Sequence, residues 1–220
     1  MANCILILGE SGTGKSTSIR TLDPKETAII SVIGKPLPFK GWKNGYQMCT
    51  KENPEGNLAV TDKADSIIKM LKYFSKRETI HHIVIDDFQY LLANEYMRRA
   101  KEKSYEKFTD IGQNAWAVIN ESQELRKETN GLNVYIMAHV ERDASGREKI
   151  KTIGKMLDDK ITVEGLFTTV LYTVRDENGY HFMTQNNGNN TCKSPLGMFS
   201  GNLIDNDLAL VAEAIKNYEI

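Results

Sequence analysis

Residues 9–16 read Gly-Glu-Ser-Gly-Thr-Gly-Lys-Ser and come directly after the apolar run of residues 4–8. The spacing G-x-x-x-x-G-K-[ST] between a strand and a helix is typical of a loop whose backbone N–H groups surround a phosphate chain. We expect a helix from about Gly14, with the positive end of its dipole facing the phosphates. The predicted nucleotide-binding residues are Gly9, Glu10, Ser11, Gly12, Thr13, Gly14, Lys15, Ser16 and Thr17.

Two side chains of this loop have predicted roles of their own. Lys15 supplies a positive charge for the β- and γ-phosphates, and we expect it to be exposed in the empty loop. The Ser16 hydroxyl is placed to bind Mg²⁺. A second element, residues 82–87, is an apolar run that ends in Asp86 and Asp87. Such a strand delivers an acid to the Mg²⁺ beside a P-loop, so Ser16 and Asp86 form the predicted metal site.

Length and composition indicate an ordinary globular protein. A chain of 220 residues suits a single domain over residues 1–220. Charged residues make up 26%, hydrophobic residues 40%, and the net charge is −1, which excludes a globally basic nucleic-acid binder. Cys4, Cys49 and Cys192 lack paired spacing, so we expect reduced thiols and no zinc site. Without a signal peptide or membrane span, a cytoplasmic location is expected.

Strand and helix patterns alternate along most of the chain. Apolar spacing indicates one helix around residues 64–74, behind a possible Asp62 cap, and another around residues 111–125 that ends at Asn130-Gly131. The tail predicts a hairpin across residues 176–179 and a last helix with Leu208, Val211, Ile215 and Tyr218 on one face. The predicted strands are residues 3–8, 28–32, 46–50, 82–85 and 134–138. This pattern predicts an α/β fold with a mainly parallel sheet, helices on both faces, and the ligand at the carboxyl ends of the strands.

The tail and the missing motifs separate classes of P-loop proteins. A hairpin and one helix after the sheet favour a RecA-like core over an AAA+ module, which would carry a helical lid. No [NT]-K-x-D run is present, which argues against a GTPase. Small-molecule kinases commonly carry an arginine-rich lid, whereas the segment 141–155 is richer in lysine.

With GESGTGKS, IVIDDF and VYIMAHV at this spacing, the chain resembles the RecA-like ATPases of phage replication and recombination modules, including the Sak-type single-strand annealing family. The resemblance extends over nearly the whole chain. It implies ATP and Mg²⁺ as cofactors and single-stranded DNA as a partner. It also implies a homo-oligomer, contacts with a single-strand-binding protein or helicase, and the host-cell cytoplasm as location.

The resemblance also suggests catalytic residues. In such proteins the strand after the acidic strand ends in a polar residue followed by histidine, and here that strand ends in Ala138-His139. His139 is therefore expected to contact the γ-phosphate or to be structural. RecA relatives often have a catalytic glutamate at the end of the strand that follows the P-loop helix, but residues 29–34 contain no acid. The candidate bases are therefore Asp87 and then Glu52, and Arg175 is the candidate arginine finger for a neighbouring subunit.

Two segments carry local positive charge. The first holds Arg142, Arg147, Lys149, Lys151 and Lys155, where the RecA-like fold places a DNA-binding loop. The second places Arg98, Arg99, Lys101, Lys103 and Lys107 among Tyr96, Tyr105 and Phe108, which suits phosphate contact with base stacking or a solvated helix face over core aromatics.

The sequence therefore favours an ATP-binding, ATP-hydrolysing protein that binds single-stranded DNA. Two alternatives stay open. One is a small-molecule or nucleotide kinase in which residues 141–155 cover an acceptor. The other is a helicase loader or recombination mediator in which ATP controls a protein contact. Stimulation of ATP hydrolysis by single-stranded DNA, or phosphoryl transfer to a small acceptor, separates the first two.

Overall fold

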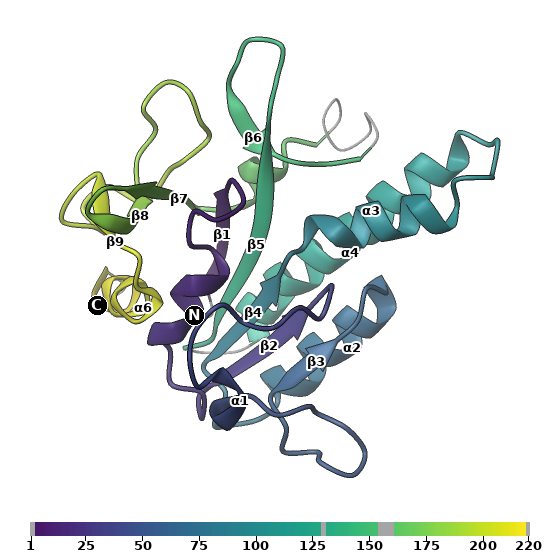
Figure 1. Cartoon of the computed structure of the whole chain (residues 1–220), viewed down its shortest axis with the longest axis horizontal. Helices are drawn as coiled ribbons and strands as arrows, with labels where there is room; N and C mark the ends of the chain where they lie inside the picture. Colours follow the sequence, from purple (N-terminus) through teal and green to yellow (C-terminus); the bar gives the residue numbers. More distant parts are fainter. Residues whose placement is uncertain (1–2, 129–130, 154–160, 219–220) are drawn as a thin grey trace.

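A nine-stranded, mainly parallel sheet forms the centre of the chain in the computed structural model, which describes residues 3–128, 131–153 and 161–218 (Figure 1). The strand order is β3-β2-β4-β5-β1-β7-β8-β9, with β6 paired to β5 outside this path. The strands are β1 (Asn3–Gly9), β2 (Thr27–Ser31), β3 (Leu58–Val60), β4 (His82–Asp86), β5 (Asn133–Arg142), β6 (Glu148–Ile150), β7 (Thr169–Asp176), β8 (Gly179–Met183) and β9 (Leu203–Asp205).

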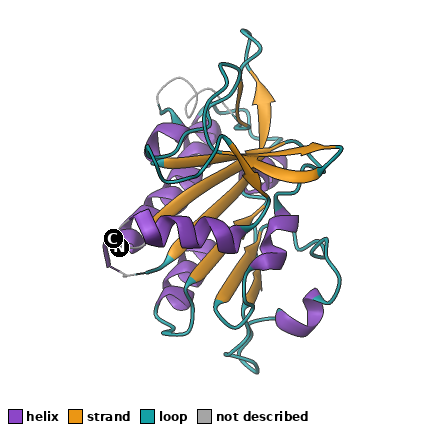
Figure 2. Cartoon of the chain, turned by 90° about the vertical axis from the view of Figure 1, so that its left-hand side faces the viewer, coloured by secondary structure: helices purple, strands orange, loops and turns teal. Residues whose placement is uncertain are grey.

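Helices cover both faces of this sheet, as the sequence predicts (Figure 2). Alternate residues of β1 point to opposite faces, so Leu6 packs with α2, α3 and α4 whereas Ile7 packs with η1 and α6. The helical elements are η1 (Ser16–Thr21), α1 (Trp42–Gly45), α2 (Ala64–Ser75), α3 (Gln89–Arg98), α4 (Glu106–Glu128), η2 (Val163–Leu166) and α6 (Leu208–Tyr218).

The position of β5 fixes the site. This strand pairs in parallel with β1 on one side and with β4 on the other. It therefore lies between the strand that leads into the phosphate loop and the strand that ends at Asp86. The register places His139 beside Gly9. β5 was predicted to end at Ala138, but it continues to Arg142 because β6 pairs with its last residues.

Several local predictions are wrong. Residues 46–50 form no strand, and only Met48 makes an isolated bridge to Leu58. The side-chain amide of Asn57 explains this, because it donates to the carbonyls of Pro24, Thr27 and Gly45 and so holds the segment as a loop. Asp62 does not cap α2; it accepts hydrogen bonds from Asn94 and Arg98 instead.

The tail largely matches its prediction. β7 and β8 form the expected antiparallel hairpin, and Leu208, Val211 and Ile215 of α6 are buried. Tyr218 does not share their buried face, since it is 48% exposed. Gly131 has the left-handed backbone expected of a helix stop, whereas Asn130 lies outside the described residues. Strand β9 was not predicted, because three residues carry too little periodicity.

Candidate functional site

The glycine-rich loop packs tightly against strands β7 and β8. Thr13 bonds the carbonyl of Glu10 at 2.8 Å and the hydroxyl of Thr173 in β7 at 2.6 Å. A side chain at Gly9 would collide with Thr173, and one at Gly14, where φ is +106°, would collide with the ring of Tyr180. These positions therefore require glycine for close backbone approach as well as for loop conformation.

The element after the loop differs from the expected helix. η1 is a six-residue 3₁₀ helix that begins at Ser16, not an α-helix from Gly14. Its sequence, Ser-Thr-Ser-Ile-Arg-Thr, is poor in strong helix formers, and Pro24 follows shortly after its end. Phosphate binding at this loop would therefore depend on the loop N–H groups and on Lys15 rather than on the dipole of a long helix.

Lys15 is buried, contrary to the expectation that it is exposed. Only 6% of the residue is accessible, and its ammonium donates to the carbonyls of Gly9 at 2.8 Å and Glu10 at 2.7 Å. Burial lowers the pKa of Lys15 to about 8, although Asp87 and Asp86 act in the opposite direction. These two contacts hold the lysine on its own loop, beside the position predicted for the phosphates.

The predicted metal residues meet in the structure. The Ser16 hydroxyl donates to Oδ1 of Asp86 at 2.9 Å, across 70 residues of sequence. Burial, and secondarily the negative charge of Asp87, raises the pKa of Asp86 to about 6. The Ser16 hydroxyl and the Asp86 carboxylate fit a divalent cation, because Mg²⁺ prefers oxygen ligands. The cation would also offset the negative charge that burial makes unfavourable on Asp86.

Asp87 lies next to this pair and is held by the side chains of Lys35 and His139. Its Oδ2 is 2.7 Å from the ammonium of Lys35, and its Oδ1 is 3.7 Å from Nε2 of His139. Burial alone would raise the pKa of Asp87, but the contacts with His139 and Lys35 outweigh it and hold the pKa below its ordinary value. Among the described non-glycine residues, Asp87 alone has a positive φ, which is +61°.

Two residues of the site were missed by sequence reasoning. Lys35 comes directly after residues 29–34, where a catalytic glutamate was expected and none is present. Gly34, which has a positive φ, was a signal that the chain turns there. Gln89 starts α3 and accepts a hydrogen bond from the backbone N–H of His139 at 3.1 Å. Its position three residues after Asp86 was the available signal.

Glu52 is not brought to this site. It lies in the exposed loop before β3, at the lower edge of Figure 1. Asn57 ties this loop to Pro24 and to Thr27, the first residue of β2. The loop is therefore at the amino ends of the parallel strands, whereas the glycine-rich loop is at their carboxyl ends. Asp87 is the candidate base that the structure brings beside Ser16 and Asp86.

The first basic segment is a β-hairpin, not an open loop. β6 pairs antiparallel with the end of β5, and several charges are paired within the hairpin. Arg142 contacts Glu148 at 3.1 Å and Glu10 of the glycine-rich loop at 3.8 Å, while Lys149 is 3.7 Å from Glu141. Arg147 donates to the carbonyl of Asn190, and the Lys151 side chain is exposed. Lys155 lies outside the described residues, as does Gly154.

The hairpin, the end of β7 and the 187–190 loop line a polar cleft of about 500 Å³. Glu10 and Thr13 of the glycine-rich loop line it, together with Arg142 and Arg175. Arg175, the candidate finger, is at the exposed end of β7, with its guanidinium 5.2 Å from the centre of the Tyr180 ring. The structure therefore brings Arg175 beside the glycine-rich loop of its own chain.

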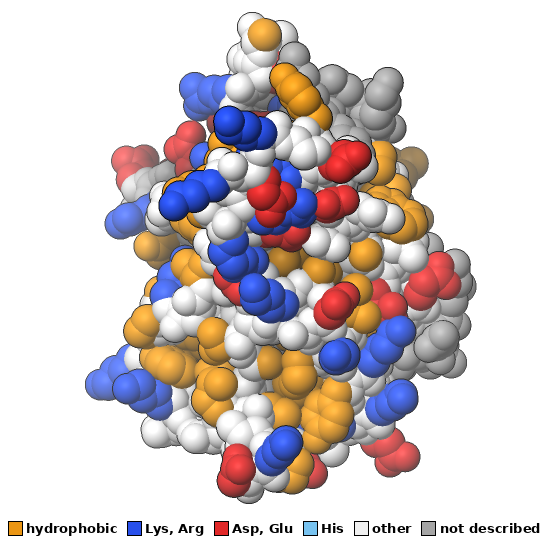
Figure 3. Space-filling model, turned by 90° about the vertical axis from the view of Figure 1, so that its right-hand side faces the viewer, with side chains coloured by type: hydrophobic (Ala, Val, Ile, Leu, Met, Phe, Trp, Pro, Cys, Tyr) orange, Lys and Arg blue, Asp and Glu red, His pale blue; other side chains and the backbone are white. Residues whose placement is uncertain are grey.

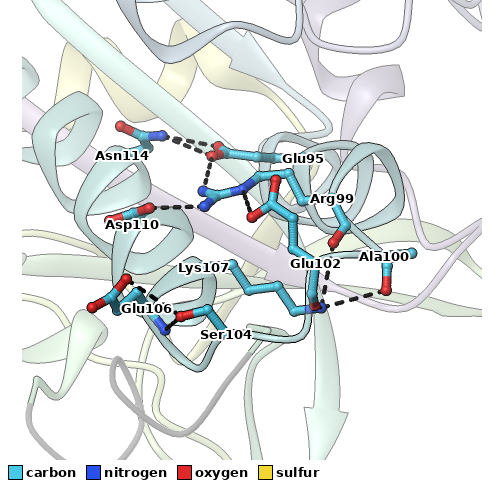
Figure 4. Close-up of polar contacts among 9 residues, drawn as sticks. All are labelled: Glu95, Arg99, Ala100, Glu102, Ser104, Glu106, Lys107, Asp110 and Asn114. Atoms are coloured by element: carbon cyan, nitrogen blue, oxygen red, sulfur yellow. Dashed lines mark hydrogen bonds and ion pairs between the residues drawn. The ribbon is translucent and has the colours of Figure 1, made fainter.

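The second basic segment is largely a structural turn between α3 and α4 (Figure 4). The Arg99 guanidinium bonds carboxylates of Glu95, Glu102 and Asp110. The buried Lys107 ammonium donates to the carbonyls of Arg99, Ala100 and Glu102, beyond the end of α3. Basic and acidic side chains intermingle on this side of the molecule (Figure 3). Tyr96 and Phe108 stack on each other with Lys107 against both rings, whereas Tyr105 is exposed.

The fold and the site define a nucleotide-binding domain of the P-loop ATPase type. A family model described as AAA domain matches residues 1–196, so the chain belongs to this AAA domain family. A comparison with curated proteins gave no match. From the hairpin and single helix of its tail, the chain was expected to differ from AAA+ modules. The match shows that this kind of tail does not exclude membership of the AAA domain family. Among the described helices, none is long and apolar enough to cross a membrane.

Replacing Lys15 with methionine should preserve the fold and weaken nucleotide binding by about 10- to 100-fold. Methionine keeps most of the buried length, whereas the loss of charged hydrogen bonds to phosphate removes about 1.5–3 kcal/mol. Isothermal titration calorimetry with MgADP measures the effect, and circular dichroism checks the fold. A folded variant with wild-type affinity would contradict the P-loop assignment.

Asp86→Asn should stabilise the empty protein and abolish Mg²⁺-dependent nucleotide binding. Because the pKa of Asp86 is raised to about 6, the wild type loses stability as pH rises from about 4 to 6, and the variant does not. The gain above pH 6 is at most about 3 kcal/mol, at 1.36 kcal/mol per pKa unit. Urea unfolding at pH 4 and pH 8 measures it, with the exposed Asp205→Asn as control. A variant that is equally destabilised at both pH values would refute this account.

Lys107→Met should destabilise the fold by about 1–3 kcal/mol, because three carbonyls lose a charged donor. The exposed Lys103→Met serves as the matched control and should stay within about 0.5 kcal/mol of the wild type. Urea unfolding of both variants makes the comparison. Equal stability of the two variants would show that Lys107 does not hold the α3–α4 turn.

Proposed function

We propose that this chain is a Mg²⁺-dependent ATPase that binds single-stranded DNA beside its P-loop, in a phage replication or recombination module. The observation that carries ATP hydrolysis is the convergence of Lys15, the Ser16–Asp86 hydrogen bond and Asp87 at the carboxyl ends of the strands. Ser16 and Asp86 would hold Mg²⁺, which when bound neutralises phosphate charge.

The remaining residues fit an in-line attack by water on the γ-phosphate. Lys15 is positioned to leave the carbonyls of Gly9 and Glu10 for the phosphates. The Asp87 carboxylate is the proposed acceptor of the water proton. The proposed role of His139, whose Nε2 is 3.7 Å from Oδ1 of Asp87, is to orient this carboxylate. Arg175 would add positive charge to the site, in the same chain or in a neighbouring subunit of a homo-oligomer.

The cleft between the β5–β6 hairpin and the 187–190 loop supports the DNA part of the proposal. Arg142 and Arg175 offer guanidinium groups, and Asn187 and Asn189 offer amides, which are common partners of the phosphate backbone. The hairpin and the loop are joined, because the N–H of Glu148 donates to the carbonyl of Asn189 at 2.8 Å. The contact between Arg142 and Glu10 connects this surface to the P-loop. The phage module itself is supported by the resemblance of the sequence motifs.

Single-stranded DNA should stimulate Mg²⁺-dependent release of phosphate from ATP. The double variant Arg142→Gln/Lys151→Gln should bind DNA more weakly and reduce the slope of log affinity against log salt by about 1.4, at about 0.7 per lost phosphate contact. Lys101→Gln/Lys103→Gln, with two exposed lysines on the α3–α4 turn, is the control. Fluorescence anisotropy at several salt concentrations measures the slopes. An unchanged slope removes the hairpin as the DNA site, and phosphate transfer to an added small acceptor would favour a kinase.

A further inference from the structure

Lys35 is linked to the acidic pair on one side and open to solvent on the other. Its ammonium is 2.7 Å from Oδ2 of Asp87, and its side chain is 44% exposed while that of Asp87 is 2% exposed. The chain turns back at Gly34, where φ is +68° and the N–H donates to the Ser31 hydroxyl at 3.0 Å. This turn brings the flexible side chain of Lys35 to the Asp87 carboxylate.

Two acidic and two basic side chains lie together at the centre of the site. Asp86 and Asp87 contribute two carboxylates, and Lys15 and Lys35 contribute two ammonium groups. Opposite charges lower the cost of holding these groups out of water. A γ-phosphate bound beside Lys15 brings further negative charge close to Asp87, and the two anions repel unless a cation stands between them.

We propose that Lys35 recognises the γ-phosphate of ATP and thereby gives the site a preference for ATP over ADP. This inference rests on the proposed function, because it places a nucleoside triphosphate at the P-loop. Lys35 moves from a contact with Asp87 alone to a position between Asp87 and the γ-phosphate. The chain of ADP ends at the β-phosphate, which the loop N–H groups and Lys15 hold, so ADP does not engage Lys35.

A different role for Lys35 predicts different behaviour. If Lys35 only neutralises Asp87, its effect on ATP disappears once Asp87 carries no charge. If Lys35 contacts the γ-phosphate itself, its effect persists when Asp87 is replaced by asparagine. Asparagine tolerates the left-handed backbone at this position, so Asp87→Asn changes the charge without adding backbone strain. The variants Lys35→Gln, Asp87→Asn and their combination form a double-mutant cycle that separates the two roles.

Calorimetry of binding provides the test, with the Mg²⁺ complexes of the β,γ-imido analogue of ATP and of ADP as ligands. Lys35→Gln should weaken binding of the analogue about tenfold or more and leave ADP within about twofold, as expected for the loss of one charged phosphate contact. The same loss should appear when Lys35→Gln is added to Asp87→Asn. Lys35→Arg should restore most of the preference, and Lys40→Gln, an exposed lysine on the same segment, should match the wild type.

Each other outcome overturns the proposal in a recognisable way. A preference for the analogue that survives Lys35→Gln removes Lys35 from γ-phosphate recognition and leaves the proposed ATPase intact. Equal weakening of both ligands assigns Lys35 a general role in the site. A loss confined to the background with native Asp87 means that Lys35 only neutralises that carboxylate. Absence of nucleotide binding by the wild type overturns the proposed function together with this inference.

Discussion

Two adjacent carboxylates held out of water, Asp86 and Asp87, impose the main constraint on this site. Each is about 1% exposed, and neither can stay buried and charged without partners. Ser16 bonds the first, whereas Lys35 and His139 approach the second. The buried strand β4 delivers both acids to one edge of the sheet, and the neighbouring strand β5 supplies the histidine. The sheet order therefore matters to the chemistry as well as to the core.

The charged side chains of the site have partners within the chain. Lys15 bonds two loop carbonyls, Ser16 bonds Asp86, and Lys35 bonds Asp87. A nucleotide with its metal ion would have to compete with the carbonyls that hold Lys15 and with the hydroxyl that bonds Asp86. For these groups, net binding is the difference between two bonded states.

Sequence patterns revealed the parts of this site that depend on local spacing. The glycine-rich loop and the strand ending in Asp86 follow fixed residue types, and the sequence placed Ser16 and Asp86 at one predicted site, where a 2.9 Å hydrogen bond joins them. Lys35 was not found, because its contact with Asp87 joins two elements whose adjacency depends on the order of strands in the sheet. Glu52 was misplaced for a related reason. The amide of Asn57 outweighed the weak strand pattern of residues 46–50, and no local periodicity reports such a side chain.

Strand β5 runs for ten residues from the centre of the sheet into the hairpin above it, with no break at His139 (Figure 1). A continuous strand resists bending, and the three residues from His139 to Arg142 span only about 10 Å. The hairpin therefore behaves as a stiff lever fixed in the core, not as a hinged flap. The 187–190 loop is attached to this arm, because the N–H of Glu148 donates to the carbonyl of Asn189 and Arg147 donates to that of Asn190. A displacement at His139 would therefore appear at the hairpin tip as a tilt of the whole arm together with this loop.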